Sequence, residues 1–101
     1  MKIVSKADVA SAASYADTIA ALRRAFAGEF ITPPRHHHDL SPSATYLLMP
    51  AWTGPANPGP AYAGLKTVMV MPDNPARGLP TIQASYILYS AGTGGCAPMQ
   101  R

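Results

Sequence analysis

The spacing of apolar residues changes from helical to strand-like near Thr32, which divides the chain into two regions. In the first region, four apolar residues follow one another at intervals of three or four positions, as they do on one face of an α-helix. These residues are Tyr15, Ile19, Leu22 and Phe26. The pattern predicts a helix over about residues 14–27 and a second, shorter helix over about residues 6–12.

Local signals predict the ends of these helices. Ser5 is followed by Asp8 and Ser14 by Asp17, which is the spacing of a capping box. In this motif the serine hydroxyl accepts a backbone N–H bond and the acidic side chain reaches back. Gly28 follows the apolar stripe and is typical of a helix end. We therefore expect both helices to begin just after a serine.

Beyond Thr32 the pattern predicts strands. Three segments are rich in β-branched and aromatic residues, and stretches rich in Pro and Gly separate them. They cover residues 44–50, 61–71 and 81–90. Short connections between consecutive strands favour an antiparallel meander. The predicted fold class is α+β, with N-terminal helices packed on a mostly antiparallel sheet in a single domain over residues 1–101.

Charged residues are scarce in the strand-rich region. Between Leu40 and Gln100 the only charged side chains are those of Lys66, Asp73 and Arg77. A small domain leaves much of its surface in water. A stretch this apolar therefore predicts a surface that another subunit covers. We expect a homodimer or a higher homo-oligomer that associates through its apolar strands.

Composition and charge argue against several classes of function. The net charge of +3 is spread thinly and the longest basic run is Arg23 and Arg24, which disfavours nucleic-acid binding. No segment has the length of an apolar membrane span, and the N-terminus lacks the apolar core of a signal peptide. Cys96 is the single cysteine, so an internal disulfide cannot form. These features predict a cytoplasmic protein with neither nucleic-acid nor membrane partners.

The sequence PPRHHHD, residues 33–39, raises the question of a metal site. In an extended chain the rings of His36 and His38 point to one side and the ring of His37 to the other, so two of them could converge. A tetrahedral site needs further ligands, and the chain has no second cluster of His, Cys or acidic residues. We predict no bound metal, with the histidines solvated or hydrogen-bonded.

A glycine-rich segment follows the last predicted strand. Gly92, Gly94 and Ala97 match the spacing of a dinucleotide-binding fingerprint. That motif needs a helix immediately after it, so that the helix amides meet the pyrophosphate. Pro98 and the end of the sequence at Arg101 leave no room for such a helix. A hairpin turn is therefore the predicted structure.

Lys66 and Arg35 are the residues with the clearest candidate chemistry. Lys66 lies within an apolar strand, where it either deters aggregation at a sheet edge or holds its ammonium near a cleft to meet an anion. Arg35 follows two prolines and is either an ordinary surface residue or a bidentate clamp for a carboxylate. Spacing alone leaves both alternatives open.

The segments PPRHHH, ATYLLMPAW and AGLKTVMVMPDNPARGLPTIQASYILYSAGTG follow one another along the chain. In this order they resemble the ornithine cyclodeaminase/mu-crystallin family, whose members include ketimine reductases and an alanine dehydrogenase. The resemblance implies the substrate-binding and dimerisation part of a two-part enzyme. The Rossmann part, which binds NAD(P) in the full-length family, is absent from these residues, so we expect no cofactor in this chain.

The resemblance also implies roles for three residues. It assigns Arg35 and Lys66 to the carboxylate of a small amino or keto acid, and it places Thr81 beside the nicotinamide. Leu47 stands where ornithine-specific members have an acid, so an ornithine substrate is not implied. We expect no catalytic residue and no activity in this chain alone. The alternative is an interaction module that pairs with a separate Rossmann-type chain and rebuilds an active enzyme.

Overall fold

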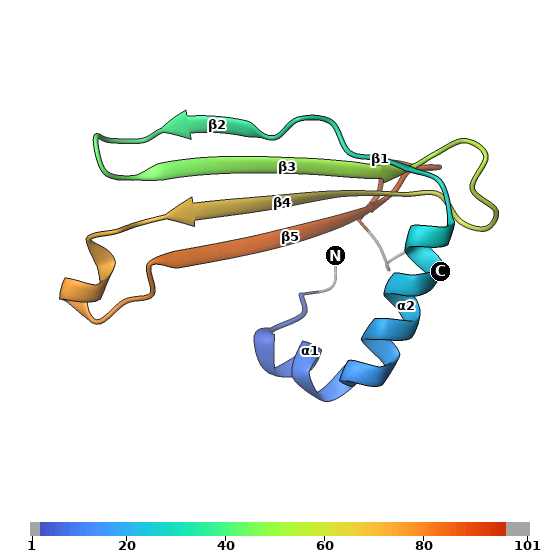
Figure 1. Cartoon of the computed structure of the whole chain (residues 1–101), viewed down its shortest axis with the longest axis horizontal. Coiled ribbons are helices and arrows are strands. Elements are labelled where there is room, and N and C mark those ends of the chain that lie inside the picture. The colour runs from blue at the N-terminus through green and yellow to red at the C-terminus, as the bar shows by residue number, and fades with distance from the viewer. Residues whose placement is uncertain (1–2, 97–101) are drawn as a thin grey trace.

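The fold was analysed in a computed structural model, which describes residues 3–96. Two helices come first, five strands follow, and a short 3-10 helix precedes the last strand (Figure 1). The elements are α1 (Lys6–Ala12), α2 (Tyr15–Ala27), β1 (Phe30–Ile31), β2 (His36–Asp39), β3 (Thr45–Thr53), β4 (Tyr62–Val70), η1 (Asn74–Arg77) and β5 (Ile82–Ser90).

Both helices begin where the serines predict. At α1 the Ser5 hydroxyl accepts a bond from the Asp8 N–H at 3.1 Å, and the Asp8 carboxylate accepts the Ser5 N–H at 2.9 Å. At α2 the Ser14 hydroxyl accepts the Asp17 N–H at 3.1 Å, without a reciprocal bond. Both bonds of the first predicted capping box are therefore confirmed. In the second, only the bond accepted by the serine hydroxyl is confirmed.

The strands form one antiparallel sheet with β3 and β4 at its centre. The order is β1, β3, β4, β5, and β2 pairs with β3 on the same side as β1. The α+β class and the antiparallel sheet are thus confirmed. Three details were not predicted from the sequence. Residues 30–31 and 36–39 form short strands, and β3 continues past Pro50 to Thr53.

Pro50 is accommodated because of a gap in the pairing of β3. On one side, β2 pairs with residues 45–48 of β3 and β1 pairs with residues 52–53, which leaves Pro50 between the two short strands. On the other side Pro50 lies opposite Leu65 of β4. A proline has no N–H to donate, so it is tolerated in a strand where a ladder bond is not required.

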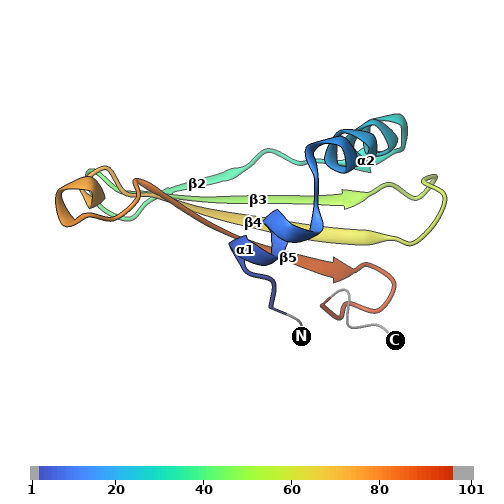
Figure 2. The same ribbon diagram turned by 90° about the horizontal axis from the view of Figure 1, so that it is seen from below.

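The helices lie apart from the sheet, whereas the sequence led us to expect them packed on it. Within residues 3–96, no Cα atom of either helix lies within 8 Å of a Cα atom of a strand. Figure 1 shows both helices beyond the β5 edge of the sheet, and the end of α2 connects them to it. Figure 2 shows the same arrangement from the side on which the helices lie. Neither helix has the length and hydropathy needed to cross a bilayer.

Glu29 explains this separation, because it ties the end of α2 to the loop after β3. Its N–H donates to Asn57 Oδ1 at 3.1 Å, and its side chain accepts the Ala56 N–H at 3.0 Å. Its carbonyl accepts the Gly54 N–H at 2.9 Å. These bonds hold the helix at the end of the sheet and fix the direction in which it leaves.

As a result, the described residues bury little apolar surface. Ala44 and Val68 are the buried apolar residues of this part of the chain. Large apolar side chains remain exposed on α2 and β5, including Phe26 at 72% and Tyr86 at 62%. Apolar area this extensive on a small domain is typical of surfaces that another chain covers.

Candidate functional site

Lys66 lies at the middle of β4, in the centre of the sheet. It is paired with Met49 of β3 on one side and with Tyr86 of β5 on the other. Directly paired residues of an antiparallel sheet share a face. Lys66 is exposed on this face, which we call the Lys66 face. Since β4 is a central strand, Lys66 does not guard a sheet edge, which was one of the alternatives left open by the sequence.

Arg35 immediately precedes β2 and is exposed. The β2–β3 register pairs His36 with Leu48 and His37 with Leu47. The pairing begins at His36, and Arg35 is the residue before it; continuing the register by one step would place it level with Met49, the residue paired with Lys66. Strands are spaced by about 4.8 Å, so that position is about 10 Å from Lys66, on the other side of β3. Two long side chains can reach one small anion across this span.

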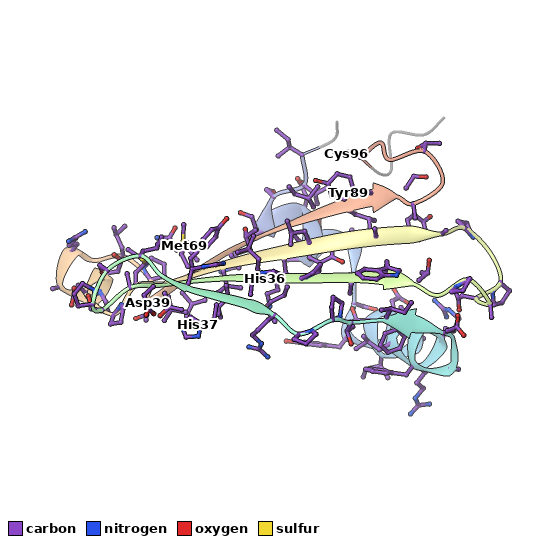
Figure 3. The ribbon with its side chains drawn as sticks, turned by 90° about the horizontal axis from the view of Figure 1, so that it is seen from above. His36, His37, Asp39, Met69, Tyr89 and Cys96 are labelled. Carbon is purple, nitrogen blue, oxygen red and sulfur yellow. The ribbon has the colours of Figure 1, made fainter. Side chains whose placement is uncertain are left out.

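No carboxylate neutralises these two cations within residues 3–96. The ion pair of this part of the chain joins His37 Nε2 and Asp39 Oδ1 at 3.3 Å, and both groups are exposed. Figure 3 shows His36, His37 and Asp39 along β2, at one side of the sheet. Arg35 and Lys66 therefore keep their charges available for an external anion.

Tyr86 joins this group, and the sequence reasoning missed it. Tyr86 is paired with Lys66, and its ring lies over Gly64, where a Cβ atom would overlap the Tyr86 hydroxyl. The phenol thus lies against β4 two residues from Lys66. The signal in the sequence was Gly64 itself, since a glycine inside a strand often marks a close approach by another group.

Thr81 lies elsewhere. It directly precedes β5, is half-buried, and its carbonyl accepts the Met71 N–H at 2.6 Å. Met71 is five residues beyond Lys66, which corresponds to about 17 Å along an extended strand. The sheet therefore brings Arg35 and Lys66 to one region and leaves Thr81 at the far end. Its proposed place beside a nicotinamide stays a prediction.

The histidines do not assemble a larger cluster. His36 and His38 have their ring centroids 6.3 Å apart on the opposite face from Lys66. Within residues 3–96, no three His, Cys, Asp or Glu side chains are placed to hold a metal ion together.

The glycine-rich segment forms the hairpin turn that the sequence predicted. The Gly94 N–H donates to the Ser90 carbonyl at 2.7 Å, and Gly94 has a φ of 79°. The chain then returns along β5, where Cys96 pairs with Tyr89 (Figure 3). Ala97, the last position of the fingerprint, lies outside the described residues. In residues 3–96, a strand, a tight turn and a single bridge back to that strand do not present helix amides to a pyrophosphate.

A groove lies at the junction of α2 with the loop after β3. Its walls include Arg24, Gly28, Phe30 and Pro58. Neither Arg35 nor Lys66 lines it. Both residues are exposed in the part of the chain that the structure describes, so a closed substrate pocket around them would need a covering element.

Comparison with known sequences identifies one protein family. The model of the ornithine cyclodeaminase/mu-crystallin family matches residues 2–99. An uncharacterized protein of Schizosaccharomyces pombe is 33% identical over 100 residues, which cover 92% of this chain and 29% of that protein. The Arabidopsis thaliana protein SAR DEFICIENT 4 is 36% identical over 63 residues, covering 62% of this chain and 19% of that protein.

Solved structures show the same fold. An archaeal alanine dehydrogenase dimer with bound NAD superposes with a TM-score of 0.73 and 34% identity, over 90% of this chain and 28% of that one. The Δ1-pyrroline-2-carboxylate reductase of Thermococcus litoralis, in complex with NADH and L-proline, gives a TM-score of 0.78. It is 23% identical over 95% of this chain and 30% of its own. The chain thus spans less than a third of these relatives.

Proposed function

Because this chain belongs to the ornithine cyclodeaminase/mu-crystallin family, matched over residues 2–99, we propose that it is the substrate-binding and dimerisation part of such an NAD(P)-dependent enzyme. In this proposal it binds a small amino or keto acid by its carboxylate and has no catalytic activity alone. The observation that supports the proposal is that Lys66 pairs with Met49 of β3, while the neighbouring Leu48 pairs with His36, the residue after Arg35.

The residue types suit this task. A guanidinium and an ammonium form charge-assisted hydrogen bonds with a carboxylate, and two such donors fix its orientation as well as its position. The Tyr86 hydroxyl, beside Lys66, can donate a further bond to the same ligand. A ligand oriented in this way can present its α-carbon to a cofactor, which supplies the hydride chemistry when bound. This part of the enzyme therefore contributes positioning.

L-Proline is a suitable probe, since it is the ligand named with the Thermococcus litoralis relative. We expect L-proline and pyruvate to shift NMR signals of residues around Lys66, with weak affinity. Lys66→Met or Arg35→Met should weaken binding about tenfold or more, the usual effect of losing a hydrogen bond to a charged group. Arg77→Met, which removes a cation from η1, is the matched control and should bind as the parent does.

Prolinamide tests the carboxylate directly, because it keeps the ring and replaces the anion with a neutral amide. It should bind far more weakly than L-proline. Equal binding of the two compounds, or equal binding by the Lys66→Met protein, would contradict the proposal. The 101-residue chain should also fail to oxidise NADH with pyruvate and ammonia, and turnover in that assay would contradict the expected lack of activity.

A second candidate is an interaction module that pairs with a separate Rossmann-type chain and rebuilds an active enzyme. What favours it is the exposed apolar surface of α2 and β5, which another chain could cover. Affinity purification from the native source should then recover a dinucleotide-binding polypeptide, and adding that polypeptide should restore turnover. Recovery of this chain alone would favour the first candidate.

A further inference from the structure

The Tyr86 side chain lies along the surface of the sheet on the Lys66 face. Tyr86 is paired with Lys66, but the end of its ring lies where a Cβ atom of Gly64 would be. A Cβ atom at Gly64 would lie 2.5 Å from Tyr86 Cζ and 3.1 Å from Cε1. Gly64 is two residues from Lys66 along β4, so the ring crosses diagonally onto the neighbouring strand. Tyr86 therefore turns one broad side of its ring toward the sheet and the other toward solvent.

This outward side of the ring is open. Tyr86 is 62% exposed, although the end of its ring touches Gly64. Within residues 3–96 its ring stacks on no other ring and its hydroxyl has no hydrogen-bond partner. Aromatic rings of a folded domain usually contribute to packing, and a buried tyrosine hydroxyl usually finds a partner. An open ring fixed against the backbone of β4 is therefore available to a ligand.

The charges around Tyr86 indicate where an anionic group of that ligand would lie. The face of an aromatic ring is negative, so a carboxylate avoids it and binds the neighbouring Lys66 ammonium. The acidic residue of β2 is distant, because Asp39 is level with Val70, four residues from Lys66. A flat ring that carries a carboxylate at its edge satisfies both neighbours, with its anion at Lys66 and its face over Tyr86.

We propose that Tyr86 is a specificity-determining residue, which selects planar unsaturated or aromatic ring carboxylates over saturated rings of the same size. The inference rests on the carboxylate site proposed above and names the class of ligand that fits it. Cβ atoms of directly paired residues are only about 5 Å apart, so a ring joined to a carboxylate at Lys66 extends over Tyr86. Flat rings stack with an offset over their whole face, whereas a puckered ring makes fewer contacts.

Gly64 prepares this surface before a ligand arrives. Because Gly64 has no Cβ atom, the Tyr86 ring rests on the backbone of β4. A ring that already lies in its binding position loses little conformational freedom when the ligand stacks on it. Stacking between two rings should therefore favour the planar ligand about two- to tenfold.

The binding of 2-furoate and tetrahydro-2-furoate to the 101-residue chain tests the proposal. Both compounds are five-membered oxygen rings with one carboxylate, and they differ in whether the ring is flat and aromatic. NMR titration should give about two- to tenfold tighter binding of 2-furoate. The furan proton signals should also move upfield on binding, because they lie over the face of the Tyr86 ring.

Variants of Tyr86 separate stacking from the effect of its hydroxyl. Tyr86→Leu should bring the affinity ratio of the two compounds close to one and abolish the upfield shift. Tyr86→Phe keeps the ring and should keep both. The matched control is Tyr62→Leu, which removes an exposed tyrosine of the same strand face, four residues from Lys66. It should leave the ratio unchanged, and circular dichroism verifies that each variant is folded.

The outcomes distinguish this inference from the proposed function. Equal binding of the two compounds by the parent chain, or a preference that survives in Tyr86→Leu, would overturn the role of Tyr86 and leave the carboxylate site intact. Binding of neither compound would overturn both. The comparison of L-proline with prolinamide judges the carboxylate site separately, because neither of those rings is aromatic.

Discussion

The two outer strands β2 and β5 lie at opposite edges of one sheet and differ in length, charge and exposed apolar surface. β2 has four residues, HHHD, and its exposed His37–Asp39 pair places charge at the edge. β5 has nine uncharged residues, with Ile82 and Tyr86 both more than half exposed. Short, polar edges resist the addition of another strand, whereas long, uncharged edges invite it.

This difference shows where the sheet ends and where it can continue. The β2 edge already has the features that soluble proteins use to stop pairing, and the Arg35 that precedes it is available for ligand binding. The β5 edge has none of these features in the described residues. The carboxylate site proposed above lies toward the β2 edge, whereas the β5 edge is the one open to a further strand.

The largest expected effect comes from blocking the β5 edge with proline. Ala84 directs its N–H outward, so Ala84→Pro removes an edge donor without removing a bond to β4. The dimer should weaken at least about tenfold, because both copies lose a bond and gain the bulk of a proline ring at the interface. Sedimentation velocity over a range of concentrations measures the change.

The matched change at the other edge is His38→Ala. His38 is exposed on β2, far from β5. Its replacement should therefore leave the association constant of the dimer unchanged. If His38→Ala dissociates the dimer and Ala84→Pro does not, then the polar edge is the interface and the comparison is reversed.

The second prediction concerns Gly64, which lets Tyr86 lean inward and keeps the β5 edge clear. Gly64→Ala places a methyl group where the Tyr86 ring and hydroxyl lie. It should lower the free energy of unfolding by about 1 kcal/mol, the lower end of the usual cost of overpacking, because the exposed Tyr86 ring can move aside. Urea denaturation measures this loss, and adding Tyr86→Ala should remove most of it.

Gly92→Ala is the control for Gly64→Ala. A Cβ atom at Gly92 would have its nearest neighbour, Ser90 Oγ, at 3.8 Å, which is an ordinary contact. Its free energy of unfolding should stay close to that of the parent. Equal losses for the two variants would show that backbone flexibility, and not the Tyr86 ring, decides the effect.

The sequence predicted the long elements because their signals are local. The apolar stripe with Ser14 marked α2, and alternation marked the three long strands. β2 was missed because a four-residue run of histidines and aspartate has no apolar period and becomes a strand only by pairing with β3. The extension of β3 past Pro50 was missed for a related reason, since the gap between β1 and β2 exists only in the assembled sheet.

The candidate site was partly accessible from sequence. Arg35 and Lys66 were candidates from their residue types, and the family resemblance assigned them a carboxylate, but their relative placement depends on the pairing register, which no local pattern specifies. Tyr86 was not singled out from the sequence, because its approach to Gly64 is a contact between strands. The separation of the helices from the sheet depends on the Glu29 bonds to the loop after β3, which span 27 and 28 residues.

A smaller effect is expected when the charge on the β2 edge is reduced. Asp39→Asn removes the partner of His37 from an exposed pair, with Asp39 itself 80% exposed. Exposed pairs contribute less than about 1 kcal/mol, so the free energy of unfolding should change little. The association constant of the dimer should not change. Guanidinium denaturation with sedimentation tests both. Stronger association in the variant would show that this charge had been restraining the β2 edge.

The smallest effect is expected in acid, and it separates α1 from the uncharged β5 interface. The Ser5 backbone N–H, and then its side chain, hold the pKa of Asp8 below its ordinary value of 3.8. Because the pKa is lower in the folded state, the ionised carboxylate stabilises α1 at pH values above the ordinary pKa. This contribution is lost as the pH falls through the lower pKa of the folded state. Helical circular dichroism should therefore decrease slightly in that window, and Asp8→Asn should abolish the change.

The dimer should persist over the same window wherever the sheet stays folded, because β5 has no charged group to titrate. Dissociation that follows the protonation of Asp8 would instead tie α1, and not the β5 edge, to the contact between subunits.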